Sequence, residues 1–178
     1  MDDYLKWVES EANGMRVKKA LTDYSFTLQY KPHTYMALMR LKSPNPPVAE
    51  LNKVKELYGD LQYFTLRITS GDNEELMKAQ GGDNLEYFQR LEYFSGQMQD
   101  QLRLIDGKDT LPCVLYHFER NYGLAPYSDI DLAFAGTTAK NNDKILYYED
   151  ILLGTGPIYI PISGEAIRQE PQLQLSAK

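Results

Sequence analysis

The residues of this chain best suited to covalent chemistry are one cysteine and two histidines. Cys113 and His117 stand four residues apart in CVLYH, and His33 occurs far earlier in the chain. A cysteine nucleophile requires a general base within hydrogen-bonding reach, and an imidazole can serve as that base. On a helix the side chains of Cys113 and His117 would be neighbours. On a strand they would share a face but lie about 13 Å apart.

The segment around Cys113 has the composition of a strand, because it combines β-branched and aromatic residues and begins beside Pro112. We therefore predict a buried structural cysteine. The alternative is a small hydrolase-like enzyme whose site assembles in three dimensions around Cys113, His117 and His33. His33 lies in DYSFTLQYKPHTYMAL, which predicts a strand and then a break at Pro32, with the histidine in an exposed turn.

Acidic residues gather in several places without the spacing of a metal site. Asp129 and Asp131 share one face of a predicted strand, and residues 72–75 and 141–143 form acidic or amide-rich loops. None of these segments has the spaced oxygen ligands and central glycine of a calcium loop. Two distant histidines do not make a zinc site. We predict solvated acidic turns, no metal site and no cofactor.

Tyrosine is the aromatic residue that the chain favours, with 14 tyrosines against six phenylalanines. Exposed aromatic residues on a rigid sheet commonly bind proteins or glycans. Tyr147 and Tyr148 are adjacent, so on a strand they must point to opposite faces. Packing between rings on neighbouring strands is the competing interpretation. The candidate binding residues in the C-terminal part of the chain are Tyr122, Tyr127, Tyr147, Tyr148 and Tyr159.

The overall composition is that of one globular domain over residues 1–178. Apolar residues make up 43% of the chain, charged residues 25%, and the formal net charge is −6. The first 42 residues hold seven basic and five acidic groups, an excess too small to predict nucleic-acid binding. No apolar run approaches the roughly 20 residues of a transmembrane helix. The acidic first ten residues do not resemble an export signal.

Hydrophobic spacing predicts an α+β fold, mainly an antiparallel sheet. Apolar residues recur at helical spacing over about 46–58 and 84–105, which predicts two amphipathic helices that cover one sheet face. Asp83 is the expected cap of the second helix. Short connections favour antiparallel neighbours and make the C-terminal third rich in β-structure. Strands are predicted at residues 24–31, 61–69, 111–119, 129–134, 144–150 and 157–162.

Two segments resemble sequences of a known group. They are NGMRVKKALTDYSFTLQYKPHTYMAL, from Asn13, and YYEDILLGTGPIYIPISGEAIRQEPQLQL, from Tyr147. Together they resemble uncharacterised bacterial cell-envelope lipoproteins, in which Asn-Gly precedes a basic strand, YKP follows it, and a glycine-containing strand closes the domain. The resemblance implies an exported protein with a lipidated cysteine upstream of Met1. It assigns no activity to any residue.

These observations favour a non-catalytic binding or scaffolding domain of a cell-envelope lipoprotein, attached to the membrane only through an upstream lipid anchor. A cytoplasmic location is the alternative compartment. The alternative functions are the hydrolase-like enzyme and a subunit of a larger envelope assembly. We expect a protein or glycan partner and no nucleic acid.

Overall fold

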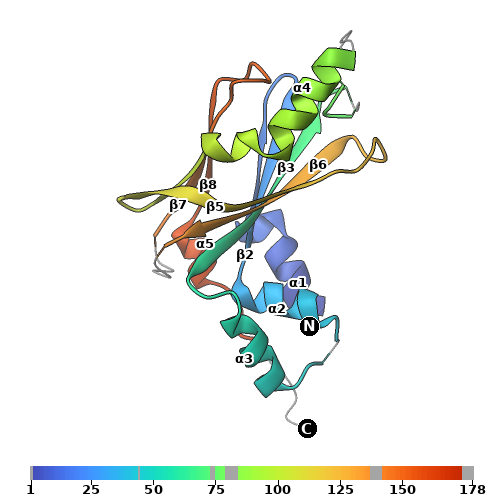
Figure 1. Cartoon of the computed structure of the whole chain (residues 1–178). Helices are drawn as coiled ribbons and strands as arrows, with labels where there is room; N and C mark the ends of the chain where they lie inside the picture. Colours follow the sequence, from blue (N-terminus) through green and yellow to red (C-terminus); the bar gives the residue numbers. More distant parts are fainter. Residues whose placement is uncertain (1, 44, 73–74, 79–83, 137–141, 174–178) are drawn as a thin grey trace.

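The computed structural model describes residues 2–43, 45–72, 75–78, 84–136 and 142–173. The described chain is built around one antiparallel sheet of eight strands in the order β1-β2-β3-β6-β5-β4-β7-β8. The sheet curls until its two outer strands, β1 and β8, lie side by side. The fold is therefore α+β with an antiparallel sheet, as predicted, but the sheet forms a nearly closed barrel (Figure 1).

The strands are β1 (Arg16–Ala20), β2 (Tyr24–Lys31), β3 (Leu61–Ser70), β4 (Leu102–Asp106), β5 (Asp109–Glu119), β6 (Tyr127–Ala135), β7 (Lys144–Glu149) and β8 (Pro157–Ile162). The helices are α1 (Asp2–Glu9), α2 (His33–Leu41), α3 (Val48–Glu56), α4 (Asn84–Ser95) and α5 (Gly164–Arg168). Short 3-10 turns, η1 (Glu11–Asn13) and η2 (Gln97–Gln101), precede β1 and β4. None of the described helices has the length and apolar character that crossing a bilayer requires.

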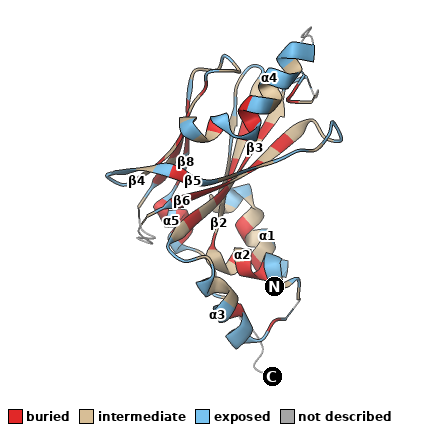
Figure 2. Ribbon diagram, in the orientation of Figure 1, coloured by how far each residue is buried: buried red, intermediate tan, exposed pale blue. Residues whose placement is uncertain are grey.

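Large apolar side chains fill the inside of the barrel. Figure 2 shows in red the buried positions along the strands. On β3 the residues Phe64, Leu66 and Ile68 are buried, while the residues between them are only partly buried. The rings of Phe64 and Phe134 meet edge to face, with their centroids 5.8 Å apart. Both rings are at most 1% exposed. The interior is thus a packed core, as expected for a barrel of eight strands.

The two predicted helices do not cover one face of the sheet. α4 lies at one end of the barrel and inserts Tyr93 and Phe94 into the core, whereas α3 packs against α2 at the other end (Figure 1). The predicted arrangement is wrong because a sheet that curls on itself buries its own inner face. No flat apolar face then remains for a layer of helices.

The helix predicted over 84–105 is also shorter than expected. α4 ends at Ser95, before Gly96, and the apolar residues from Leu102 onward belong to β4. Glycine is a weak helix former, so Gly96 favours an end to the helix. Over a stretch as short as 102–106, the apolar residues of a strand that faces the core can also match helical spacing. α3, by contrast, falls within the predicted range 46–58. Asp83, the predicted cap, lies outside the described residues.

His33 begins α2 and does not lie in an exposed turn. Its Nε2 atom is 2.7 Å from the backbone oxygen of Leu61, and its half-buried ring contacts the rings of Tyr58 and Tyr63. The break at Pro32 is real, but it marks the N-cap of a helix. The prediction failed because Tyr35 and Leu38, at helical spacing, bury one side of α2 against α1 and α3.

A buried ion pair joins β4 to β7. Lys144 and Asp106 stand opposite each other in the ladder, and each side chain is 2% exposed. The Nζ atom of Lys144 is 2.9 Å from Oδ1 of Asp106. The other carboxylate oxygen accepts a hydrogen bond of 2.8 Å from Nε2 of Gln62 on β3. Asp106 of β4 therefore links Gln62 of β3 and Lys144 of β7 inside the barrel.

Replacing Lys144 by methionine leaves the carboxylate of Asp106 buried without a cation. We expect Lys144→Met to lower the free energy of unfolding by about 3–5 kcal/mol, as for other buried pairs that lose one partner. The double variant Lys144→Met/Asp106→Asn should regain most of this loss, because it buries no charge. Urea denaturation measures both effects. Arg168→Met, which breaks the exposed pair with Glu165, is the control and should cost less than about 1 kcal/mol. A Lys144→Met protein as stable as the wild type would contradict the conclusion that the carboxylate of Asp106 is buried and depends on Lys144.

Candidate functional site

Polar side chains cover the outer face of four neighbouring strands, β1, β2, β3 and β6. We call this surface the polar face. Two rows of directly opposed residues run across it, in the order β1, β2, β3, β6: Lys18, Thr27, Arg67 and Asp129 in one, and Arg16, Gln29, Thr65 and Asp131 in the other. Because side chains alternate along a strand, these residues point away from the core that their chain neighbours fill.

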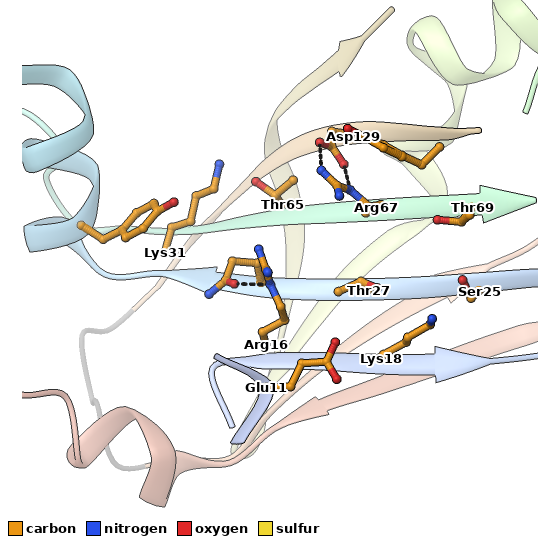
Figure 3. A pocket seen from close by; sticks show the side chains of 13 residues that line it. Glu11, Arg16, Lys18, Ser25, Thr27, Lys31, Thr65, Arg67, Thr69 and Asp129 are labelled. Carbon is orange, nitrogen blue, oxygen red and sulfur yellow. Dashed lines mark hydrogen bonds and ion pairs between the residues drawn. The ribbon is translucent and has the colours of Figure 1, made fainter. Parts of the chain in front are cut away.

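The polar face is hollowed into a depression of about 420 Å³ (Figure 3). The hydroxyl groups of Ser25, Thr27, Thr65 and Thr69 line it together with charged groups from β1, β3 and β6. Tyr35 of α2 closes one side. Burial, supported by the hydrogen bond from its hydroxyl to Glu9, raises the pKa of Tyr35, so this hydroxyl stays protonated. The depression thus offers hydroxyl groups and charges within one concave surface.

The cations of β2 and β3 have carboxylate partners. Arg67 donates two hydrogen bonds of 2.7 Å to Asp129, and this pairing raises the pKa of the guanidinium. Lys31 lies 2.9 Å from Asp131. These two ion pairs neutralise the carboxylates of β6 and the cations of β2 and β3 on the polar face.

The cations of β1 have no such partner. Arg16 donates from Nε to Oε1 of Gln29 at 2.8 Å, and Gln29 is neutral. Lys18 is exposed and forms no hydrogen bond or ion pair with a described residue. Glu11 lines the same depression, but it is not within ion-pair distance of either cation. The β1 side of the polar face therefore carries two positive charges that no described carboxylate neutralises.

Gln29 fixes the position of the Arg16 guanidinium. The buried amide of Gln29 donates from Nε2 to the backbone oxygens of Val8 and Tyr30, both at 2.9 Å. These bonds leave Oε1 directed at Arg16, where it accepts the hydrogen bond from Nε (Figure 3). A guanidinium carries five N–H donors. The Nε edge of the Arg16 guanidinium is thus held by Gln29, and the N–H donors on its other nitrogens are oriented before any ligand binds.

The predicted binding tyrosines occupy different environments. Tyr127 lines the depression, but the guanidinium of Arg67 lies 3.7 Å from its ring centroid and covers one ring face. Tyr147 and Tyr159 point outward from β7 and β8 as a pair, with centroids 5.0 Å apart. Tyr148 faces the core, is 1% exposed and bonds to Tyr93 and Asp150 through its hydroxyl.

Tyr122 is exposed in the loop between β5 and β6, with the guanidinium of Arg120 4.7 Å from its ring centroid. The sequence had predicted opposite faces for Tyr147 and Tyr148, and the strand places them so. Only Tyr127 of the five tyrosines contributes to the depression itself.

Cys113, His117 and His33 are not brought together. A β-bulge between Cys113 and Leu115 shifts the alternation of β5, so the thiol points inward while His117 is exposed. The sequence had placed both on one face, which is wrong because an inserted residue reverses the alternation. His33 lies on α2 and bonds to the backbone of β3. Burial raises the pKa of the Cys113 thiol to about 11.

Among the described residues, no three histidine, cysteine or acidic side chains gather as a metal site would require. Asp129 and Asp131 do share one face, as predicted, but each is engaged by a cation. Residues 73, 74 and 141, which belong to the acidic and amide-rich loops of the sequence analysis, lie outside the described residues.

Sequence reasoning missed the polar face because hydrophobic spacing had not predicted β1, and the resemblance alone implied a basic strand after Asn13-Gly14. A signal was present, since Arg16 and Lys18 alternate with Val17, and Thr27 and Gln29 alternate with Phe26 and Leu28. The alternation could have predicted an outward polar surface on each strand. The order β1-β2-β3-β6, which assembles these surfaces, involves partners up to 74 residues apart and leaves no local signal.

No family model matches the sequence, and comparison with curated proteins and with solved structures gave no significant match. The function of this protein is therefore inferred from the geometry of the polar face and its surroundings.

The Cys113 thiol should react slowly in the folded protein. At about pH 8, a pKa of about 11 leaves roughly 100-fold less thiolate than an unperturbed cysteine has. We expect Ellman's reagent to label the native protein at least about 100-fold more slowly than the protein unfolded in guanidinium chloride. Rapid labelling of the native protein would place the thiol in an accessible site and favour the hydrolase-like alternative.

Proposed function

We propose that the protein is a non-catalytic binding domain whose polar face recognises a negatively charged ligand. The observation that carries the proposal is the pair Arg16 and Lys18, two cations without a carboxylate partner among the described residues. They stand at the rim of a depression lined by hydroxyl groups. An anion placed there would gain charge-assisted hydrogen bonds and separate no existing ion pair.

The groups that line the depression are suited to holding a ligand. Hydroxyl groups donate and accept hydrogen bonds, and Arg16 is oriented in advance by Gln29. None of the described lining residues is a cysteine or a histidine. Preorganised donors reduce the entropy that is lost on binding, so a rigid sheet is an effective support for such a surface.

The charge of the chain favours this location. The protein carries a net charge of −6, so an anionic ligand is repelled by most of its surface. Arg16 and Lys18 reverse the sign locally, and the neutralised pairs Arg67–Asp129 and Lys31–Asp131 border them. A ligand with concentrated negative charge is therefore directed toward β1.

In this proposal the domain belongs to a cell-envelope lipoprotein, and its partner is a protein or a glycan. The support for the compartment is the resemblance in residues 13–38 and 147–175. At the cell envelope, anionic polymers outside the cell would be accessible to a surface of this kind.

The double variant Arg16→Ala/Lys18→Ala tests the proposed function. We expect the wild-type protein to bind a soluble carboxylate polymer, polygalacturonate or poly-L-glutamate, with an affinity that falls as salt screens the charges. The double variant should bind about tenfold more weakly or worse, because it lacks two exposed charge contacts of up to about 1 kcal/mol each. Isothermal titration calorimetry at two salt concentrations measures both effects.

The matched control is Lys53→Ala/Lys108→Ala. These exposed lysines lie on α3 and in the turn between β4 and β5, outside the depression. The control removes the same net charge, so it should retain wild-type affinity if position matters. Equal losses in both double variants would show a general charge effect, and no binding of either polymer by the wild type would refute the proposal.

A further inference from the structure

β1 and β8 lie beside each other along the line where the barrel is not closed by a ladder. The ammonium of Lys19 donates to the backbone oxygen of Tyr159 at 3.2 Å. A side chain at Gly14 would come within 3.0 Å of Cβ of Ala166. Gly14 precedes β1 and Ala166 follows β8 in α5, so these two contacts show that β1 and β8 run in opposite directions. Pro157 and Pro161 of β8 lack the N–H group that a ladder requires.

An aromatic pair on β7 and β8 therefore lies close to β1, whose outer face carries Arg16 and Lys18. Tyr159 of β8 is 48% exposed, and its ring packs against that of Tyr147, its partner on β7. Both rings point outward, as do Arg16 and Lys18 on the other side of the β1–β8 line. The barrel exterior thus carries two positive charges on β1 and two tyrosine rings on the adjacent strands β8 and β7.

We infer that the ligand of this surface is an acidic polysaccharide whose sugar rings carry carboxylate groups. The inference rests on the proposed function and specifies its ligand. In this arrangement the carboxylates bind Arg16 and Lys18, and the apolar face of a neighbouring sugar ring packs on Tyr159 and Tyr147. Sugar hydroxyls then meet Thr27 and Ser25 within the depression.

The combination of groups selects this chemistry over the alternatives. An acidic polypeptide such as poly-L-glutamate supplies carboxylates but no ring to pack on the tyrosines. A neutral polysaccharide supplies rings, but it would cover the two cations without neutralising them, which costs binding energy. The ring of Tyr127 cannot replace the outward pair, because Arg67 covers one of its faces. A polysaccharide whose sugar rings carry carboxylates can pair with the two cations and also pack on the two tyrosine rings.

Three probes separate these chemistries: polygalacturonate has rings and carboxylates, poly-L-glutamate has carboxylates alone, and dextran has rings alone. Each is titrated into the full chain as wild type, Arg16→Ala/Lys18→Ala, Tyr147→Ala/Tyr159→Ala and Tyr147→Phe/Tyr159→Phe. We expect polygalacturonate to bind wild type about tenfold more tightly than poly-L-glutamate, with dextran weaker still. The alanine variant of the tyrosines should lose about tenfold for polygalacturonate and nothing for poly-L-glutamate, because only the former stacks.

The phenylalanine variant keeps both rings and should retain most of the affinity, which separates stacking from loss of the hydroxyl groups. Circular dichroism and thermal unfolding confirm that each variant folds. Equal binding of both anionic polymers, or unchanged polygalacturonate binding in Tyr147→Ala/Tyr159→Ala, would overturn this inference and leave the proposed function standing. Failure of both anionic polymers to bind wild type would overturn the two together.

Discussion

Phe64 and Phe134 meet inside the barrel because β3 and β6 pair in a single register, and the same register sets Arg67 opposite Asp129 on the outside. The register that packs the inner side chains of the sheet therefore also sets which outer side chains are opposite one another. A slip of one residue would turn every core ring toward water and every outer charge toward the core. The packed interior thus fixes the pattern of charges and hydroxyl groups that the polar face displays.

The incomplete closure of the barrel has a comparable consequence. β1 has a hydrogen-bonded partner only in β2, and Lys19 bridges to β8 through one side-chain contact. Arg16 and Lys18 therefore stand where the cross-strand rows end, with no acidic strand on their other side. The carboxylates of Asp129 and Asp131 are held three strands away, on β6, by Arg67 and Lys31. The order of the strands is therefore the reason that Arg16 and Lys18 of β1 lack a carboxylate partner among the described residues.

Charge plays two different roles in this molecule. Lys144 and Asp106 are buried, so each is needed to offset the cost of burying the other. Arg16 and Lys18 remain in contact with water, where a cation is inexpensive to keep unpaired. The first pair stabilises the fold, and the second is available to a ligand. Under the function that we propose, similar residue types thus serve structure or recognition according to their depth in the barrel.

Local patterns in the sequence were enough to predict several elements. The alternation of β2 and β3, the short strands after Leu111 and the helix α3 follow from neighbouring residues, because side-chain periodicity is a local property. The opposite directions of Tyr147 and Tyr148 follow for the same reason. The sequence also identified the outward pair Tyr147 and Tyr159 as candidates, though without their relation to β1.

Tertiary structure decided the rest. The curl of the sheet removed the apolar face that α3 and α4 had been expected to cover, and the bulge at Cys113 reversed the direction of His117. The placement of Arg16 and Lys18 beside Tyr159 depends on β1 meeting β8, strands about 140 residues apart in the chain. Composition and periodicity indicated several of the strands and, away from the bulge in β5, which side of them is apolar. Which strands become neighbours was decided by packing the whole barrel at once, since contacts between distant segments leave no pattern in a local stretch of sequence.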